Sequence, residues 1–511
     1  MNKYPNVDGY KVDEVTATKL ISTDVLVVGA GNAGMMAAAA AQEKGAKVIL
    51  IEKEKTINLM RVGIASVGSN AQKRAGTVIN KQELVESLAS FAQHNVDERL
   101  LKTWVDNSAE SVNWLEDKIL KPNGAHFKSE PDAMMTNKAY QGFPTENDPT
   151  IDDESFVSYG NWFVKYQKEH KIDIRYQTSL VKLLKEKDTV TGAIVKDLGS
   201  DEFYEIRASK GVIIATGGYS ANKDLLQKWN ALSLKKNVYN DSPRSNGAGI
   251  TAALNVGAKR DEEPAESIFD RGLVPIGTKT EDLYYQTDSY DNWLWIGSYP
   301  FLKVNLRGER FANESIPYQF IVNAASKEPG YLYAMVWDDN YAEYLEKMHM
   351  LGCARYGFPG YMTDKAAFVK DTESYVEKGL VVKADTVEEL AEQLKLPINA
   401  LKQAITNNNK SVISHNDQEF GKEAYRLTPV KKAPYYGCIL GGRILCTFDG
   451  LRVNTKMEVL DENHQPIRHL YAGGNDSGGF FWGSYNDRVP GLASSHAQTF
   501  GRLAGKNAAE N

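Results

Sequence analysis

Hydrophobic and polar positions near the start of the chain follow a strand, helix, strand pattern. Asp24–Val28 is a short apolar run of β-type residues, a long alanine-rich stretch follows it, and a second apolar run leads to Glu52. Gly29, Gly31 and Gly34 stand between the first run and the alanine-rich stretch as G-x-G-x-x-G. Runs of this length and composition predict strand, turn, helix and strand, so this part of the chain is predicted to form a βαβ unit.

In such a unit each glycine has its own task. Gly29 permits a tight turn, Gly31 lets a pyrophosphate approach the backbone, and Gly34 lets helix and strand pack closely. The helix N-terminus faces the phosphates, and Glu52 can accept both ribose hydroxyls. Because glycines also mark ordinary turns, a plain βαβ unit is the alternative to a dinucleotide site. The contacts expected of a dinucleotide site come from Gly29, Ala30, Gly31, Asn32, Ala33, Gly34, Glu52 and Lys53.

The rest of the chain divides into helical, strand and loop patterns. Apolar residues recur at helical spacing over 81–119, 155–170 and 385–414. Over 173–198 they alternate with a period of two, as in hairpin strands. The stretch 121–153 is rich in Pro, Asn, Asp and Gly and is predicted to be loop.

Similar strand-and-glycine patterns mark both halves of the chain. GVIIATGG at 211–218 and HLYAGGNDSGG at 469–479 each predict a buried strand that ends in a small-residue turn. The stretch between them is rich in Tyr and Trp. We therefore predict an α/β fold with a Rossmann-like dinucleotide domain formed by both chain ends, 1–265 and 430–511, and an inserted α+β domain at 266–429.

Composition narrows the class of protein. The chain has 511 residues, of which 42% are hydrophobic and 25% charged, so we expect a globular protein with more than one domain. The net charge of −6 gives no reason to expect a nucleic-acid partner. Cys353, Cys438 and Cys446 form no C-x-x-C pair, which excludes covalent c-type haem and suits a reducing compartment. The polar N-terminus and the glycine-broken apolar segment Val25–Ala41 predict a cytoplasmic protein without a membrane span.

Motifs far apart in the chain together resemble the fumarate reductase/succinate dehydrogenase flavoprotein family, which includes urocanate reductases and 3-ketosteroid dehydrogenases. The resemblance covers residues 22–510 in order and spacing, and it includes ATGG at Ala215–Gly218 and LYAGGNDSGG near the C-terminus. It implies a bound FAD and a flavin-dependent reaction at a carbon–carbon bond next to a carbonyl or carboxylate. The two chain ends would form the FAD-binding domain, and the inserted domain would serve catalysis or capping.

The resemblance also implies flavin contacts at individual positions. Arg61–Asn70 lies where the family wraps the flavin, and it contains no His, so we expect noncovalent FAD. Asn475 stands where relatives usually have Glu against the ribityl chain. Ala493 and Ser494 fall where backbone N–H groups at a helix start meet the flavin pyrimidine and stabilise negative charge on the reduced ring. Further contacts are expected from Ala65, Ser66, Val181 at the adenine, Ala215, Thr216 and Gly217.

A candidate proton donor follows from the family signature R-F-x-N-E, which stands at Arg310–Glu314. In fumarate and urocanate reductases the residue four past that Glu is an Arg that delivers the proton, and here it is Tyr318. The string NESIPY resembles the ketosteroid dehydrogenases, where a Tyr at this position is the acid/base. A tyrosine with an unperturbed pKa of about 10 holds its proton at neutral pH and can donate it. The alternative is that Tyr318 only packs under the flavin.

A candidate for substrate binding is Arg488, which lies where fumarate reductases clamp a carboxylate. A planar guanidinium suits that task, although an ion pair with Asp487 or another acid is the alternative. Gly491 occupies the position whose backbone N–H meets the carbonyl oxygen in ketosteroid dehydrogenases. Their Tyr four residues earlier is Asp487 here, with Tyr485 two further back. Cys446 replaces a carboxylate-binding His of fumarate reductases, so fumarate itself is not expected.

The combination predicts an FAD-dependent oxidoreductase that reduces a C=C bond conjugated to a carboxylate or ketone. An aromatic wall would accommodate a bulky substrate, or the same side chains form the core of the inserted domain. The alternatives are a ketosteroid-type dehydrogenase that introduces a C=C bond, and a flavin electron carrier with no substrate of its own. Expected partners are a small-molecule enoate or enone and an external electron donor or acceptor, either a protein or a diffusible flavin. The aromatic residues concerned are Tyr284, Tyr285, Tyr290, Trp293, Trp295, Tyr299, Phe480, Phe481 and Trp482, and His496 is expected to pack near the FAD.

Overall fold

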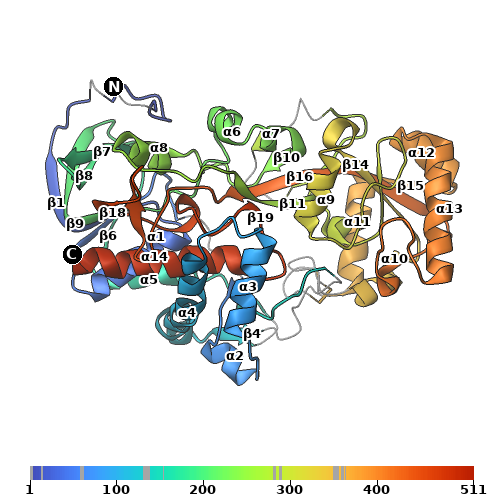
Figure 1. Cartoon of the computed structure of the whole chain (residues 1–511), viewed down its shortest axis with the longest axis horizontal. Helices are drawn as coiled ribbons and strands as arrows, with labels where there is room; N and C mark the ends of the chain where they lie inside the picture. The colour runs from blue at the N-terminus through green and yellow to red at the C-terminus, as the bar shows by residue number, and fades with distance from the viewer. Residues whose placement is uncertain are drawn as a thin grey trace.

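The structure is a computed structural model of the 511-residue chain. It describes residues 4–12, 15–57, 63–129, 139–152, 155–279, 284–286, 291–348, 356–357, 362 and 364–511. Arg61, Tyr290 and Cys353 therefore lie outside the described residues. The molecule is elongated, with one sheet near the two chain termini and a second sheet toward the opposite end (Figure 1).

The first sheet combines strands from both ends of the chain. β1 lies between β2 and β9 and is parallel to both. β18 is parallel to β9 and pairs with it, with Leu470 opposite Val212. Among the described residues the sheet has eight strands, ordered β17-β18-β8-β9-β1-β2-β6, with β7 paired to β8. They are β1 (Leu20–Val28), β2 (Val48–Ile51), β6 (Asp173–Arg175), β7 (Thr178–Glu186), β8 (Thr189–Asp197), β9 (Phe203–Ile214), β17 (Glu458–Leu460) and β18 (Pro466–Ala472).

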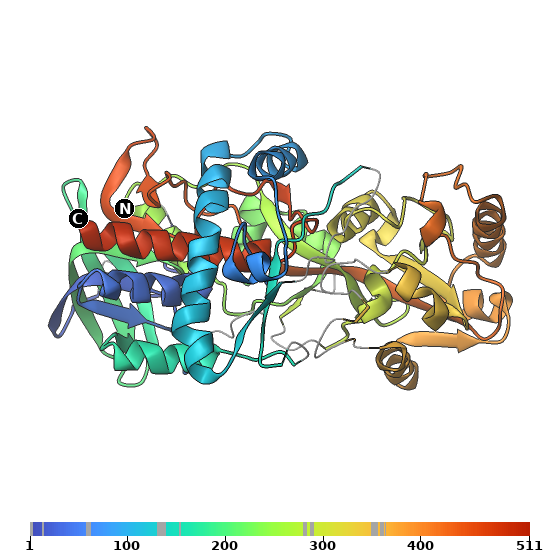
Figure 2. The same ribbon diagram turned by 90° about the horizontal axis from the view of Figure 1, so that it is seen from below.

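Helices from opposite ends of the chain cover this sheet. α1 (Asn32–Glu43) lies along α14 (Leu492–Glu510), and Figure 2 shows α4 (Glu98–Leu115) crossing α14. α1 and α14 approach each other so closely that a Cβ added at Gly501 would lie 2.2 Å from the Ala33 carbonyl oxygen. The other α-helices that precede β11 among the described residues are α2 (Asn70–Arg74), α3 (Lys81–Phe91), α5 (Gly160–Glu169), α6 (Lys223–Trp229), α7 (Ser233–Lys236) and α8 (Ala248–Asn255).

The long strand β16 (Tyr435–Thr447) organises the second sheet and runs between the two halves of the molecule (Figure 1). Its C-terminal part pairs with β11, and its N-terminal part pairs with β14 and β15. The strands that join it in this sheet are β10 (Asn237–Asn240), β11 (Ala265–Val274), β12 (Tyr285–Gln286), β13 (Leu302–Asn305), β14 (Tyr333–Asp338), β15 (Val381–Ala384) and β19 (Gly483–Ser484). The helices around it are α9 (Tyr318–Ala325), α10 (Tyr341–Tyr344), α11 (Lys365–Glu377), α12 (Val387–Leu394) and α13 (Ile398–Ser414).

The predicted domain boundaries at 265 and 430 stay a prediction. β10 and β16 lie outside the range 266–429 and nevertheless belong to the second sheet.

The prediction of loop over 121–153 is wrong for two segments. β4 (His126–Ser129) and β5 (Glu146–Thr150) form a three-stranded sheet with β3 (Ile64–Ala65). Polar side chains of β5 are buried because they make internal hydrogen bonds, as Asn147 does with the Ile64 carbonyl oxygen at 2.7 Å. A strand of this kind lacks the hydrophobic alternation on which the prediction relied.

Candidate active site

The glycine-rich motif forms the turn between β1 and α1, and its three glycines meet different surroundings. Gly29 has φ +102°, and a Cβ there would lie 2.3 Å from the Ala215 carbonyl oxygen. At Gly34 a Cβ would lie 1.8 Å from the Gly29 carbonyl oxygen, whereas at Gly31 it would meet no atom within 4 Å. Gly29 and Gly34 are therefore required by the fold itself, and Gly31 leaves space open beside the start of α1.

Glu52 ends the βαβ unit with its carboxylate turned back toward the motif. One oxygen accepts a hydrogen bond from the Ala30 backbone N–H at 2.7 Å and the other from the Glu54 N–H at 3.0 Å. Burial raises the pKa of this carboxyl, and the two N–H groups oppose the shift. Lys53 follows, with its ammonium 3.9 Å from an Asp8 carboxylate oxygen. Motif and acid therefore form one connected site.

The ATGG turn after β9 is held by Asp476, a residue that the sequence reasoning missed. Its carboxylate accepts hydrogen bonds from the Thr216 hydroxyl at 2.8 Å, from the Gly218 N–H at 2.9 Å and from the Thr216 N–H. The predicted Asn475 lies beside it and donates to the Gly217 carbonyl oxygen at 3.5 Å. The only signal in the sequence was an acid directly after Asn475, and nothing in the pattern linked it to a turn 260 residues earlier.

The predicted flavin contacts at the start of α14 also lie together. Gly491, with φ +79°, precedes the helix, and its carbonyl oxygen accepts a hydrogen bond from the Ala65 N–H at 3.0 Å. Ala493 is in the first turn of α14. Burial raises the pKa of the nearby Tyr485 hydroxyl, and the Ala493 backbone N–H opposes that shift. Ser494 is the next residue of that turn, and Ser66 is buried directly after Ala65.

Observations in the chain itself fit a bound dinucleotide. The Asn32 side-chain oxygen at the start of α1 is buried and has no hydrogen-bond partner among the described residues. Beside it are the open space at Gly31 and the N–H groups of a helix N-terminus, which attract phosphate. When bound, FAD would lie against the glycine motif, Glu52 and the start of α14.

The two predicted catalytic residues lie in one buried cluster with Asp487. Tyr318 is the first residue of α9, 7% exposed, and its backbone N–H donates to Asp487 Oδ2 at 3.1 Å. Arg488 is 1% exposed, and its Nε lies 3.7 Å from Asp487 Oδ1. Its Nη2 donates to the Ser315 carbonyl oxygen at 3.2 Å. Asp487 thus joins α9 to the loop before α14, and burial raises the pKa of its carboxyl.

The ion pair in this cluster is loose. At 3.7 Å the Arg488 Nε and Asp487 Oδ1 are beyond hydrogen-bond distance, and neither atom has another hydrogen-bond partner in the described part of the chain. A buried guanidinium with an unused donor is placed to bind an anion. If Arg488 served only as the ion-pair partner of Asp487, its Nε donor would remain buried without a hydrogen bond among the described residues.

Arg426 is a second buried arginine that the sequence reasoning missed. It lies in a short 3₁₀ turn, Ala424–Arg426, before β16, and is 1% exposed. Its Nε and Nη1 have no hydrogen-bond partner among the described residues. Burial lowers the pKa of Arg426, and the charge of nearby Arg488 lowers it further while Asp487 opposes the shift. No pattern around Arg426 distinguishes it in the sequence from a surface arginine.

Aromatic side chains surround Tyr318. The Phe269 ring centroid lies 5.1 Å from that of Tyr318, and the guanidinium of Arg271, buried in β11, lies 5.7 Å from the Tyr318 ring centre. The same guanidinium lies 4.8 Å from the Trp293 ring centre and 5.6 Å from that of Trp295. Two of the predicted wall residues are thus near Tyr318, while Phe269 and Arg271 were missed.

Other predicted wall residues take part in packing elsewhere. Tyr284 donates its hydroxyl to the Ser220 carbonyl oxygen at 2.6 Å. Phe480 and Phe481 pack around His496, whose ring centroid lies 4.7 Å and 5.2 Å from theirs. Cys446 is buried in β16.

Comparison with known families agrees with this geometry. The family model described as FAD binding domain matches residues 24–487. The chain belongs to the FAD binding domain family. This flavoprotein is therefore an FAD-dependent oxidoreductase. The structure provides no helix, in the part that it describes, with the length and apolar character needed to cross a membrane.

Two relatives extend over nearly all of the flavoprotein. A vinyl phenol reductase from Lactiplantibacillus plantarum is 27% identical over 503 residues, which cover 97% of this chain and 98% of the relative. A probable fumarate reductase from Shewanella frigidimarina is 27% identical over 519 residues, 99% of this chain and 78% of the relative.

Solved structures share the fold. The open conformation of a flavocytochrome c3 fumarate reductase superposes with a TM-score of 0.69 at 25% identity, covering 99% of this chain and 82% of that chain. A 3-ketosteroid dehydrogenase from Rhodococcus jostii superposes with a TM-score of 0.72 at 20% identity, covering 98% and 99%. The predicted fold class and the predicted FAD are thereby confirmed.

Proposed function

We propose that this flavoprotein reduces a C=C bond conjugated to a carboxylate, in a substrate with a bulky, partly aromatic body. The observation that carries the proposal is the buried cluster in which Tyr318 and Arg488 both contact Asp487. A proton donor and an anion-binding cation are the two protein groups that such a reduction requires. Bound FAD supplies the hydride.

Arg488 binds the substrate carboxylate with the donor that its ion pair leaves unused, and Arg426 adds a second positive charge nearby. As the bond is reduced, negative charge builds on the carboxylate, and fixed guanidinium groups in a site shielded from water stabilise it. A neutral ketone gains less from two such charges. The pair of arginines therefore favours an acid over a ketone as the substrate.

Tyr318 gives its proton to the α-carbon. Its backbone position at the first residue of α9 is fixed by the hydrogen bond to Asp487. Phe269 beside it offers an apolar face for an aromatic substrate. Both relatives reported above carry the name of a reductase, which supports the reductive direction.

A ketosteroid-type dehydrogenase is the second candidate, because Tyr318 and the string NESIPY fit it equally well. It would use Tyr318 as a base and would place a neutral ketone near Gly491. The two arginines with unused donors argue against a neutral substrate. A flavin electron carrier needs neither a buried tyrosine nor a buried anion site.

Anaerobic reoxidation of the dithionite-reduced enzyme tests this proposal. We compare an aryl enoate with the methyl ketone of the same aryl body and follow the flavin absorbance. The enoate should reoxidise the flavin faster. Arg488→Lys keeps the charge but loses the planar guanidinium. In this variant kcat/KM for the enoate should fall about 10-fold or more, while kcat/KM for the ketone should change little.

The matched control is Arg468→Lys, at an exposed position of β18, which should behave as wild type. An equal fall in kcat/KM for the enoate and for the ketone in Arg488→Lys would show that Arg488 has only a structural role. Desaturation of a neutral steroid ketone with an artificial acceptor, without any enoate reduction, would replace the proposal with the dehydrogenase.

A further inference from the structure

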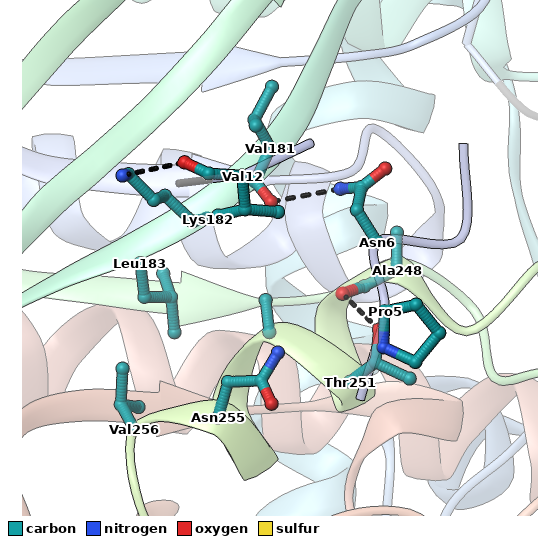
Figure 3. A pocket seen from close by; sticks show the side chains of 11 residues that line it. Pro5, Asn6, Val12, Val181, Lys182, Leu183, Ala248, Thr251, Asn255 and Val256 are labelled. Atoms are coloured by element: carbon teal, nitrogen blue, oxygen red, sulfur yellow. Dashed lines mark hydrogen bonds between the residues drawn. The ribbon is translucent and has the colours of Figure 1, made fainter. Parts of the chain in front are cut away.

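The segment Tyr4–Val12 lies along the outside of the first sheet and α8 as a strap that contains one turn, closed by the hydrogen bond from the Gly9 N–H to the Asn6 carbonyl oxygen at 3.1 Å. Its start is fixed by a reciprocal pair of hydrogen bonds with the Asn255 side chain, which accepts from the Tyr4 N–H and donates to the Tyr4 carbonyl oxygen, both at 2.9 Å. Its end is fixed at the Val12 carbonyl oxygen, which accepts from Lys182 Nζ at 3.0 Å. Figure 3 shows the segment facing β7 on one side and α8 on the other.

Asn6 and Asp8, between these two ends, make polar contacts with three separate elements. Asn6 donates its amide to the Val181 carbonyl oxygen at 2.9 Å (Figure 3). Asp8 accepts from the Ser179 hydroxyl at 2.9 Å and from the Asn246 amide at 3.0 Å. The same carboxylate lies 3.9 Å from the Lys53 ammonium. The strap therefore connects the end of β2, the start of β7 and the start of α8.

These elements surround the place expected for the adenosine of the dinucleotide. Lys53 directly follows Glu52, the predicted ribose acceptor, and the Thr178 N–H at the start of β7 donates to the Glu52 carbonyl oxygen at 2.9 Å. Glu52 in turn contacts the glycine motif through Ala30. Asp8 thus contacts Lys53, the residue that follows Glu52 in the chain.

The strap also packs through aromatic side chains: Tyr4 is buried, with its ring centroid 5.8 Å from that of Trp229, and the Tyr10 ring centroid lies 5.7 Å from that of Phe203. A small cavity separates it from the sheet and α8, with Asn6, Val12, Val181 and Thr251 among its lining residues (Figure 3). Lifting the strap therefore breaks these ring contacts as well as the hydrogen bonds of Asn6 and Asp8.

We propose that Tyr4–Val12 closes the adenosine end of the FAD site, and that Asn6 and Asp8 hold it closed and slow the release of FAD. The role concerns the cofactor and not the substrate, so it stands or falls independently of the proposed reaction. Asp8 contributes most, since its carboxylate joins all three elements.

The test is the rate of FAD release from the holoenzyme, followed by flavin fluorescence after dilution into an excess of a competing flavin-binding apoprotein. Asp8→Ala should release FAD about 10-fold faster than wild type, and Asn6→Ala by a smaller factor. Deletion of residues 4–12 should show the largest effect. The matched control, Asp188→Ala, removes the same carboxylate from the exposed turn between β7 and β8 and should leave the rate unchanged.

Release at the wild-type rate in Asp8→Ala and Asn6→Ala would overturn the proposal. Slower release or tighter binding after the deletion would also overturn it, because the strap would then compete with the cofactor. If the deleted chain does not fold, the two point variants decide the question.

Discussion

His496 is a neutral histidine in a fully buried aromatic pocket of α14. Its ring lies 4.6 Å from the Phe500 centroid, and neither ring nitrogen has a hydrogen-bond partner among the described residues. Burial lowers the pKa of His496 from 6.5 to about 3, because the charged form would lose its hydration. The folded protein therefore gains stability from a neutral His496 above pH 6.5, and this contribution is lost as the pH falls from 6.5 toward 3.

His496→Phe should weaken this acid dependence. Each pH unit below about 6.5 costs the wild type about 1.4 kcal/mol through this residue, so about 2 kcal/mol is lost by pH 5. We expect the drop in melting temperature of the holoenzyme between pH 7 and pH 5 to be smaller in His496→Phe. The exposed His464→Gln should retain the wild-type drop, and an equally large drop in His496→Phe would show that the ring titrates normally.

At the residue scale, the candidate catalytic residues come from motif chemistry. Tyr318 and Arg488 could be named because each stands at a fixed distance from a recognisable string. Asp476 and Arg426 could not, because their roles depend on partners that only folding brings near, such as Thr216 across 260 positions. A buried charge is recognised by what surrounds it, and sequence spacing does not carry that information.

At the element scale, the βαβ unit makes a prediction that separates binding from folding. Gly31→Ala should fold normally, since a Cβ there meets no atom of the protein, but it should reduce FAD affinity by about 10-fold or more by blocking the pyrophosphate. Gly34→Ala should destabilise the fold by about 1–3 kcal/mol or more, since its Cβ would overlap the Gly29 carbonyl oxygen.

The melting temperature of the apoprotein and an FAD titration measure the two effects. Wild-type FAD affinity in Gly31→Ala, or a wild-type melting temperature in Gly34→Ala, would contradict this division of tasks.

Elements with a strong apolar pattern could be predicted from the sequence, and elements held by polar contacts could not. β1, α1 and β2 lie where the apolar runs predicted them. The predicted helix over 81–119 is two helices, α3 and α4, because Asn80 and Asp97 each cap a separate start. β5 was missed because its buried positions are polar, as at Asn147, whose side chain hydrogen-bonds to the Ile64 carbonyl oxygen and the Ser66 hydroxyl.

At the scale of the whole molecule, the site depends on both ends of the chain. The first sheet pairs β9 with β18, and the loop before α14 brings Arg488 near α9, whose first residue is Tyr318. The strand-and-glycine patterns at 211–218 and 469–479 indicated that the two chain ends form one domain. They did not indicate that β10 and β16 would extend the second sheet across the predicted boundaries. Strand pairing over such separations is set by tertiary packing.

The most direct test of the account is the reoxidation of reduced Tyr318→Phe by the enoate that wild type prefers. The variant keeps the ring and its contact with Phe269 and loses only the hydroxyl. Stopped-flow absorbance under anaerobic conditions gives the rate, and the flavin spectrum gives the FAD content of the same sample. We predict that the rate falls by about 10²–10⁴ with a full complement of FAD. Reoxidation at the wild-type rate would contradict the assignment of Tyr318 as the proton donor.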